Sequence, residues 1–362
     1  MRSALPSLLL VLGVALPASA AAPVQSVEVL SEPYRVDKKY GSMMGPMSSQ
    51  KVSLEQSPWP ELLWIVGYEA RMVGADGESP MSQEFMCHSN LDLDMTHHAQ
   101  LFGWQKRTAN RLFTLSQGQF EIRFPEGFGI PMLSLEELEL TTQVLNHNVE
   151  PADFRVRHKV TLHYVRDADL TEPMRPLFAT SAAGLVLLEG EDGFFAVDQP
   201  EGAVHGPGCL PGMAASERVI EDGLGRKFSG HWVVKPGREV NRTNVTRWMQ
   251  LPFDTTVHYI AVHLHPFAES LTLRDLTTGE DVFVSPARGP ETGIGVDQVD
   301  HFSSGEGVPL YADHEYELVS VYENTSGEDR DSMAVMYLYV LDREYRRPAL
   351  LFDPHKDKGG TS

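Results

Sequence analysis

The chain has 362 residues, of which 42% are hydrophobic and 22% charged, and its formal net charge at pH 7 is −20. This acidity excludes the basic face that nucleic-acid binding needs, so we expect a small-molecule partner rather than a polyanion. The two cysteines, Cys87 and Cys209, are too few for a disulfide-stapled miniature fold. They are either free thiols or a single bridge between the two halves of the chain.

The first 20 residues have the layout of a secretory signal peptide. Arg2 precedes a short apolar run from Leu8 to Leu16, and Ala18-Ser19-Ala20 follows as a small-residue cleavage pattern. The run is too short to span a bilayer, and no later segment reads as a membrane helix. We therefore predict a secreted or periplasmic protein that lacks residues 1–20 and any membrane span.

Short stretches that alternate apolar and polar residues recur along the rest of the chain, separated by turns rich in Pro and Gly. This spacing predicts an all-β fold of sandwich or barrel type. The segment PWPELLWIVGYEARM has the strongest helical character, although it also fits a strand. In chain order the predicted strands include FEIRF, LELTTQVL, FRVRHKVTLHYV, HWVV, VHYIAVHLH, LTLRDL, YELVSVY and MAVMYLYV.

Charge and proline interrupt the strand pattern between Arg166 and Gly184. We place a domain boundary there, which gives an N-terminal domain at 24–175 and a C-terminal domain at 176–350. The polar tail at 351–362 is predicted to be disordered.

Adjacent histidines occur in the first half, in DMTHHAQLFGW. Neighbouring side chains of a regular strand face opposite ways, so His97 and His98 bind one ion only at a bend or bulge. Otherwise one of them is buried and the other exposed. His147, at the end of the strand LTTQVLNHN, would add a third imidazole, and three neutral imidazoles suit copper.

The second half contains AVHLHPF, in which strand alternation places His263 and His265 on one face. They are either a ligand pair or two core histidines satisfied by hydrogen bonds. Further along, DSMAVMYLYV places Met333 and Tyr337 on one strand face. A methionine there is normally core filler. Beside two imidazoles its thioether becomes a soft third ligand that favours copper, especially Cu(I), provided that the two strands are neighbours.

Other soft donors allow two interpretations. Cys87-His88 is either an additional thiolate–imidazole ligand set or a structural dipeptide. Met43, Met44 and Met47 either deliver Cu(I) or pack a loop. We favour the structural interpretation for both groups.

Four motifs in one order, HHAQLFG, a strand ending in HN, VHLH and DSMAVMYLY, resemble the copper type II, ascorbate-dependent monooxygenases. That family includes peptidylglycine α-hydroxylating monooxygenase and dopamine β-monooxygenase. The resemblance extends from about Thr96 to Val340. It implies two tandem antiparallel β-sandwich (jelly-roll) domains with an interdomain cleft. The implied reaction is hydroxylation of an aliphatic C–H with O2, with ascorbate as the electron donor.

The resemblance also implies two copper ions per chain. His97 and His98 match ligands of an electron-transfer copper, and His263, His265 and Met333 match those of the oxygen-activating copper. The third imidazole of the first site falls in the family at the position of Leu145, so we expect His147 to replace it by a shift of one pleat.

Two further departures concern the substrate. The arginine that grips the peptide carboxylate in the amidating enzymes corresponds to Ala261, and its partner asparagine corresponds to Val335. Tyr337 retains the tyrosine and is the catalytic candidate. Without the cationic clamp a peptide carboxylate loses its bidentate anchor, so an uncharged or more apolar substrate is expected instead of peptide amidation.

We interpret the chain as a monomeric, distant bacterial relative with monooxygenase activity on an unidentified substrate. One alternative is an exported copper-binding or copper-buffering protein that kept the ligands but lost the substrate pocket. Another is a pair of structural β-sandwiches with vestigial histidines, which would take up no metal.

Overall fold

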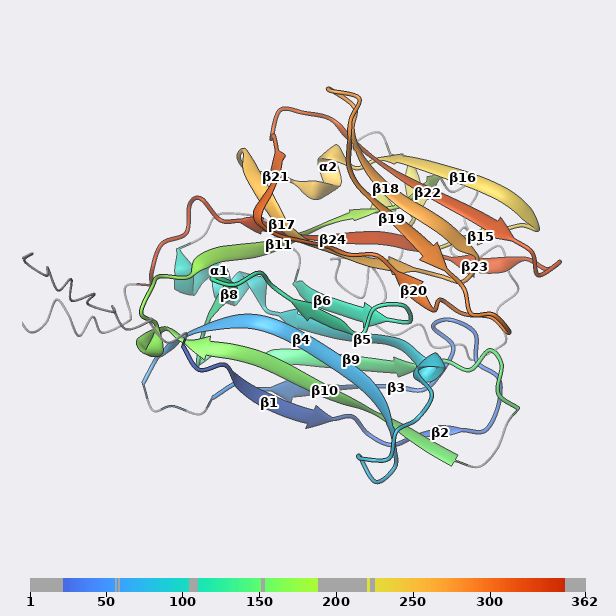
Figure 1. Ribbon diagram of the computed structural model, residues 1–362, viewed down its shortest axis with the longest axis horizontal. Helices are drawn as coiled ribbons and strands as arrows, with labels where there is room; N and C mark the ends of the chain where they lie inside the picture. The colour runs from blue at the N-terminus through green and yellow to red at the C-terminus, as the bar shows by residue number, and fades with distance from the viewer. Residues whose placement is uncertain are drawn as a thin grey trace, which may run out of the picture.

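The computed structural model describes residues 22–55, 57, 59–103, 110–150, 154–187, 220–221 and 225–348. Antiparallel strands dominate this part of the chain, which confirms the predicted all-β fold (Figure 1). No helix in the described ranges is long and apolar enough to cross a membrane. The predictions for residues 1–20, Cys209 and the tail at 351–362 lie outside the described residues.

The N-terminal half forms two facing sheets. The segment with helical character in the sequence is the long strand β4, which pairs with β10 and β8 in the middle of one sheet. The first sheet contains β1 (Gln25–Leu30), β10 (Phe154–Arg166), β4 (Leu62–Gly74) and β8 (Phe128–Leu133), with β2 (Tyr34–Val36) and β7 (Glu121–Arg123) at its margin. The second contains β3 (Met47–Val52), β9 (Leu138–Val144), β5 (Met86–Leu93) and β6 (Arg111–Ser116).

The C-terminal half has the same two layers. One layer continues the first sheet and contains β11 (Arg175–Ala183), β24 (Ala334–Leu341), β17 (Thr255–Leu264) and β21 (Phe302–Leu310). The opposite sheet contains β16 (Gly237–Asn244), β22 (Tyr316–Asn324), β18 (Ala268–Asp275), β19 (Asp281–Arg288) and β20 (Gln298–Val299). Smaller elements are β12 (Val186–Leu187), β13 (Ile220–Glu221), β14 (Lys227–Ser229), β15 (Trp232–Val234), β23 (Arg330–Ser332), and the helices η1 (Gln83–Phe85), α1 (Met95–Phe102), η2 (Asp167–Asp169) and α2 (Thr246–Met249).

The two halves are joined by backbone pairing. The predicted boundary between residues 175 and 176 falls at the start of β11, where Arg175 and Pro176 pair in parallel with Phe128 and Gly129 of β8. Beyond this point β11 runs antiparallel to β24. The Arg175 guanidinium also lies 3.5 Å from the centre of the Phe128 ring. One hydrogen-bonded path of strands therefore runs from β1 in the first half to β21 in the second.

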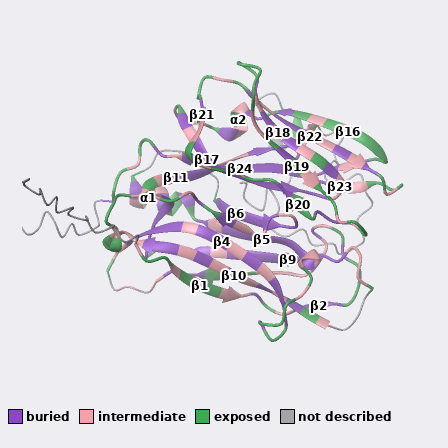
Figure 2. Ribbon diagram, viewed as in Figure 1, coloured by how far each residue is buried: buried purple, intermediate pink, exposed green. Residues whose placement is uncertain are grey.

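Aromatic side chains fill the space between the halves. The Tyr339 ring of β24 lies 5.6 Å from that of Phe113 and 4.8 Å from that of Phe124, both in the N-terminal half. The Tyr339 hydroxyl donates to the carbonyl of Leu112 (2.8 Å), and Gln119 Nε2 lies 3.2 Å from the Tyr259 hydroxyl. Buried residues of both halves belong to one cluster, seen as the purple faces of neighbouring sheets in Figure 2.

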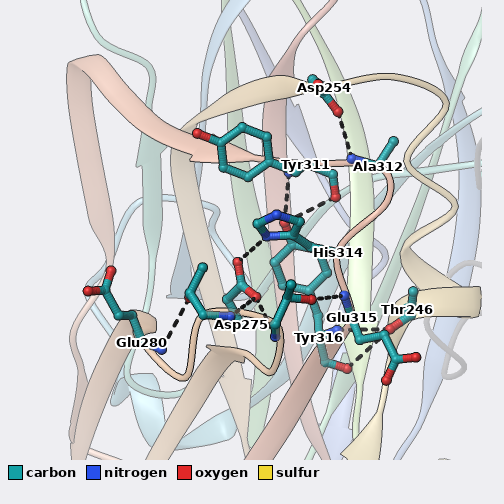
Figure 3. Close-up of polar contacts among 11 residues, drawn as sticks. Thr246, Asp254, Asp275, Glu280, Tyr311, Ala312, His314, Glu315 and Tyr316 are labelled. Carbon is teal, nitrogen blue, oxygen red and sulfur yellow. Dashed lines mark hydrogen bonds and ion pairs between the residues drawn. The ribbon is translucent and has the colours of Figure 1, made fainter.

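Asp275 fixes the turn between β18 and β19 (Figure 3). Its Oδ1 accepts hydrogen bonds from the backbone of Thr277 and Thr278 (2.8 and 3.1 Å), and its Oδ2 lies 2.6 Å from His314 Nδ1. Asp275→Ala is expected to lower the free energy of unfolding by about 2 kcal/mol, because it leaves these donors without their acceptor. Urea titration measures this change. Asp313→Ala, on the exposed residue beside His314 in the loop between β21 and β22, is the matched control, and equal losses in both variants would contradict the role of Asp275.

Candidate metal centre

The strands β17 and β24 bring together residues that are far apart in the sequence. They pair antiparallel, with His263 opposite Val335 and Ala261 opposite Tyr337. Just beyond the last pair, the His265 backbone N–H donates to the Met333 carbonyl (3.3 Å). The strand adjacency on which the predicted His–His–Met set depends is therefore present.

A small cavity lies between the two halves at this point. Its C-terminal wall contains His263, His265, Met333 and Tyr337, which are all buried. The volume is about 20 Å³, enough for one water or one ion. An organic substrate needs a site of roughly 300 Å³ or more, so this volume by itself accommodates a metal and a very small ligand.

The N-terminal half supplies the opposite wall. Met43, Cys87, His88 and Arg111 line the same cavity, so soft donors from both halves face it. Cys87 is a free thiol, and burial raises its pKa to about 12, which keeps it protonated at neutral pH. The sequence interpretation of Cys87 and His88 as a structural dipeptide did not foresee this placement.

Each imidazole of the predicted pair is held at its Nδ1. His263 Nδ1 lies 2.8 Å from Ser116 Oγ of β6, and His265 Nδ1 lies 3.4 Å from the Asp331 backbone carbonyl and 3.1 Å from Asp331 Oδ2. The two ring centres are 5.3 Å apart and the planes are nearly perpendicular. With Nδ1 of each ring in these contacts, Nε2 is the nitrogen available to a metal. Such anchoring of the second nitrogen is typical of metal-binding histidines, because it fixes the tautomer and the ring orientation.

Burial keeps the ring of His263 neutral. It lowers the pKa of His263 well below its ordinary value, with a further lowering from the charges of His265 and His88. It also lowers the pKa of His88 to about 3. Neutral imidazole is the form that binds a metal ion. Two neutral nitrogens and a thioether form a soft donor set, and that set fits Cu(I) better than zinc, magnesium or calcium.

His97 and His98 lie in helix α1 rather than on a bulged strand. The Asp94 side chain caps the helix by accepting from the backbone of Thr96 and His97, and Gly103 ends it in a left-handed conformation. His98 is buried and its Nδ1 donates to Glu136 at 2.8 Å, whereas His97 is exposed. An Asp at the N-cap and a Gly just after the last turn were the sequence signals for this helix.

His147 is not brought to this pair. It follows β9, whose end pairs with the Met86 end of β5, whereas α1 follows Leu93 at the other end. Seven residues of strand separate these ends by about 23 Å. The ligand set predicted for the first copper is therefore not assembled.

His147 lies instead close enough to His265 and Asp331 to interact with them electrostatically. Burial lowers its pKa to about 4, and the charges of His265 and Asp331 also act on it. Its Nε2 is buried and has no hydrogen-bond partner among the described residues.

Two residues near the cavity were missed by the sequence reasoning. Asp331 lies two positions before Met333 and shares its strand face by simple alternation, which was an available signal. His231 immediately precedes β15, and β15 pairs with β23, with Trp232 opposite Ser332. Only this pairing of short strands places His231 beside Asp331, so no local sequence pattern indicated it.

Comparison with known proteins assigns the chain to no family. No family model and no curated protein matches the chain. Among solved structures, it is similar to PBCV-1 VP54 fitted into a reconstruction of the virophage Sputnik, with 9% identity, 93% of this chain and 99% of that chain covered, and a TM-score of 0.33. It is also similar to recombinant N-glycanase F (PNGase F), with 8% identity, 89% and 97% coverage, and a TM-score of 0.33. Likenesses this distant carry no argument about function.

His158, buried between the sheets of the N-terminal half, makes folding sensitive to acid. Burial lowers its pKa to about 3, against about 6.5 in an unfolded chain. As pH falls below 6.5 the unfolded state takes up the proton first, so the folded state loses stability. We expect a loss of about 2 kcal/mol from this group between pH 6.5 and pH 5. Chemical unfolding across this range measures it, and an unchanged slope in His158→Phe would contradict the assignment.

Proposed function

We propose that the protein is an exported copper-dependent oxidoreductase of the monooxygenase type, with one copper ion bound by His263, His265 and Met333. The observation that carries this proposal is the convergence of the two imidazoles and the thioether on one cavity. The ligand order and the position of Tyr337 agree with the resemblance found in the sequence. When bound, copper would supply one-electron chemistry with O2, for the net reaction R–H + O2 + 2e⁻ + 2H⁺ → R–OH + H2O.

The protein's own residues would prepare this site. Contacts with Ser116 and Asp331 would orient the imidazoles of His263 and His265, and burial keeps His263 neutral. The Tyr322 hydroxyl donates to the Met333 carbonyl at 2.6 Å, which fixes the backbone that carries the thioether. Both electrons would have to come from an external reductant, because His97, His98 and His147 are too far apart to form the second site.

A second candidate function is copper binding without turnover. The small volume of about 20 Å³ beside the ligands favours it, since no substrate pocket adjoins them within that volume. Storage or transfer of Cu(I) needs only the donor set.

Metal loading and oxygen uptake separate these functions. Metal-depleted protein is loaded with copper, desalted and analysed for metal, and O2 consumption is then followed with ascorbate. We expect one copper per chain and O2 uptake that requires both copper and ascorbate. One copper per chain without O2 consumption would reject the monooxygenase and favour copper binding without turnover. Two coppers would contradict the single site, and no copper would reject both functions.

A further inference from the structure

A second group of potential ligands lies on the other side of His265. The ligand atoms of His231, His265 and Asp331 all lie within 4.8 Å of one another. His265 Nδ1 is 3.1 Å from Asp331 Oδ2, and His231 Nδ1 is 3.6 Å from Asp331 Oδ1. Three separate segments contribute these side chains: the residue after β17, the residue before β15, and β23.

We propose that His231, His265 and Asp331 form a second metal site that binds Zn²⁺. This site goes beyond the proposed function, because it requires neither Met333 nor any redox reaction. The two sites share His265, which lines the copper cavity and has its Nδ1 3.1 Å from Asp331 Oδ2.

The charges of this cluster suit a divalent cation. The His231 side chain is fully buried and that of His265 is nearly so. Both carboxylate oxygens of Asp331 are buried and have no hydrogen-bond partner among the described residues. A carboxylate in this position can supply the negative charge that a divalent cation needs. Two imidazoles and one carboxylate are a common zinc set, with the fourth position open.

His147 is the candidate for a fourth ligand. The charges of both His265 and Asp331 act on its ring, and its buried Nε2 lacks a hydrogen-bond partner in the described part of the chain. Arg330 is a nearby cation that would repel a metal ion. Its ion pair with Glu328, at 2.9 Å, offsets this repulsion. The orphaned nitrogen is the second, independent indication of a missing ligand.

Zn²⁺ would lie between Nδ1 of His265 and the carboxylate of Asp331. A neutral imidazole has one proton, which then moves from Nδ1 to Nε2, so the charge of the ring does not change.

The test measures zinc and Cu(I) binding separately on metal-free full-length protein. Zn²⁺ affinity is obtained by calorimetry and Cu(I) affinity by competition with a chelator. Wild type is expected to bind one zinc without copper present. His231→Gln should lower zinc affinity by at least about 100-fold and leave Cu(I) affinity within about threefold. Met333→Leu should lower Cu(I) affinity and leave zinc affinity nearly unchanged. His265→Gln should lower the affinity for both metals.

Several outcomes would overturn the second site. These are no zinc bound by wild type, zinc affinity unchanged in both His231→Gln and Asp331→Asn, or zinc lost in a folded Met333→Leu. Asp329→Asn, on an exposed carboxylate of the same segment, is the matched control and should bind zinc as wild type does. Zinc binding is read without any activity assay. The result for the zinc site is therefore independent of the result for the copper reaction.

Discussion

Met333→Leu is expected to reduce Cu(I) affinity by more than about 100-fold and to abolish ascorbate-driven O2 uptake. Removal of an outer-shell partner already costs about 10–100-fold in metal affinity, and loss of a direct ligand should cost more. Leucine replaces methionine at nearly equal volume, so the change should cost less than about 1.5 kcal/mol of stability. The side chain is buried against a cavity wall that leucine also fills.

Competition with a Cu(I) chelator measures the affinity, and circular dichroism with urea unfolding shows whether the fold is retained. Met336→Leu is the matched control, since Met336 is fully buried in β24, three residues after Met333, but does not line the cavity. Unchanged Cu(I) affinity in Met333→Leu would remove the thioether from the site, and with it the reason for preferring copper.

Glu136→Ala is expected to lower the free energy of unfolding by about 3 kcal/mol or more without changing copper binding. The Glu136 carboxylate is buried and accepts from His98 Nδ1 (2.8 Å) and from the Leu133 backbone N–H (2.7 Å). Alanine would leave both donors buried and unpaired, and each such loss costs about 1–3 kcal/mol. The His98 ring also stacks on Phe102, with the ring centres 4.2 Å apart, so its role is to hold α1 against the sheet.

Urea unfolding and copper stoichiometry, measured on the same preparation, test this role. Glu137→Ala changes the exposed neighbouring carboxylate and should be nearly neutral. If Glu136→Ala instead lowered the copper content of a stable protein, His98 would be a ligand after all and the single-copper proposal would fail.

Strand alternation and turn residues were sufficient to predict the all-β fold. The same alternation placed His263 and His265 on one face, because period-two patterns are local properties of the chain. The helix at His97 and His98 was missed because the adjacent histidines were considered as strand residues, although Asp94 and Gly103 are cap residues. The contribution of His231 depends on long-range pairing of β15 with β23, which no local pattern encodes.

The position of His147 shows a second reason why the sequence could not predict the whole site. Shifting the third imidazole by one pleat from Leu145 kept the strand face but assumed that β9 extends to residue 147. The strand ends at Val144, and His147 lies beyond the sheet edge, near His265. Which end of a strand faces which partner is decided by sheet order, and sheet order arises from packing of the whole chain.

The parallel pairing of β8 with β11 has a consequence for dissecting the molecule. A truncation after residue 175 would leave the β8 edge without its partner and uncover the aromatic rings that meet Tyr339. Neither fragment would keep the cavity walls intact, since each contributes one side. The protein should therefore melt in one cooperative calorimetric transition, and engineering that treats its halves as interchangeable modules should yield aggregation-prone pieces.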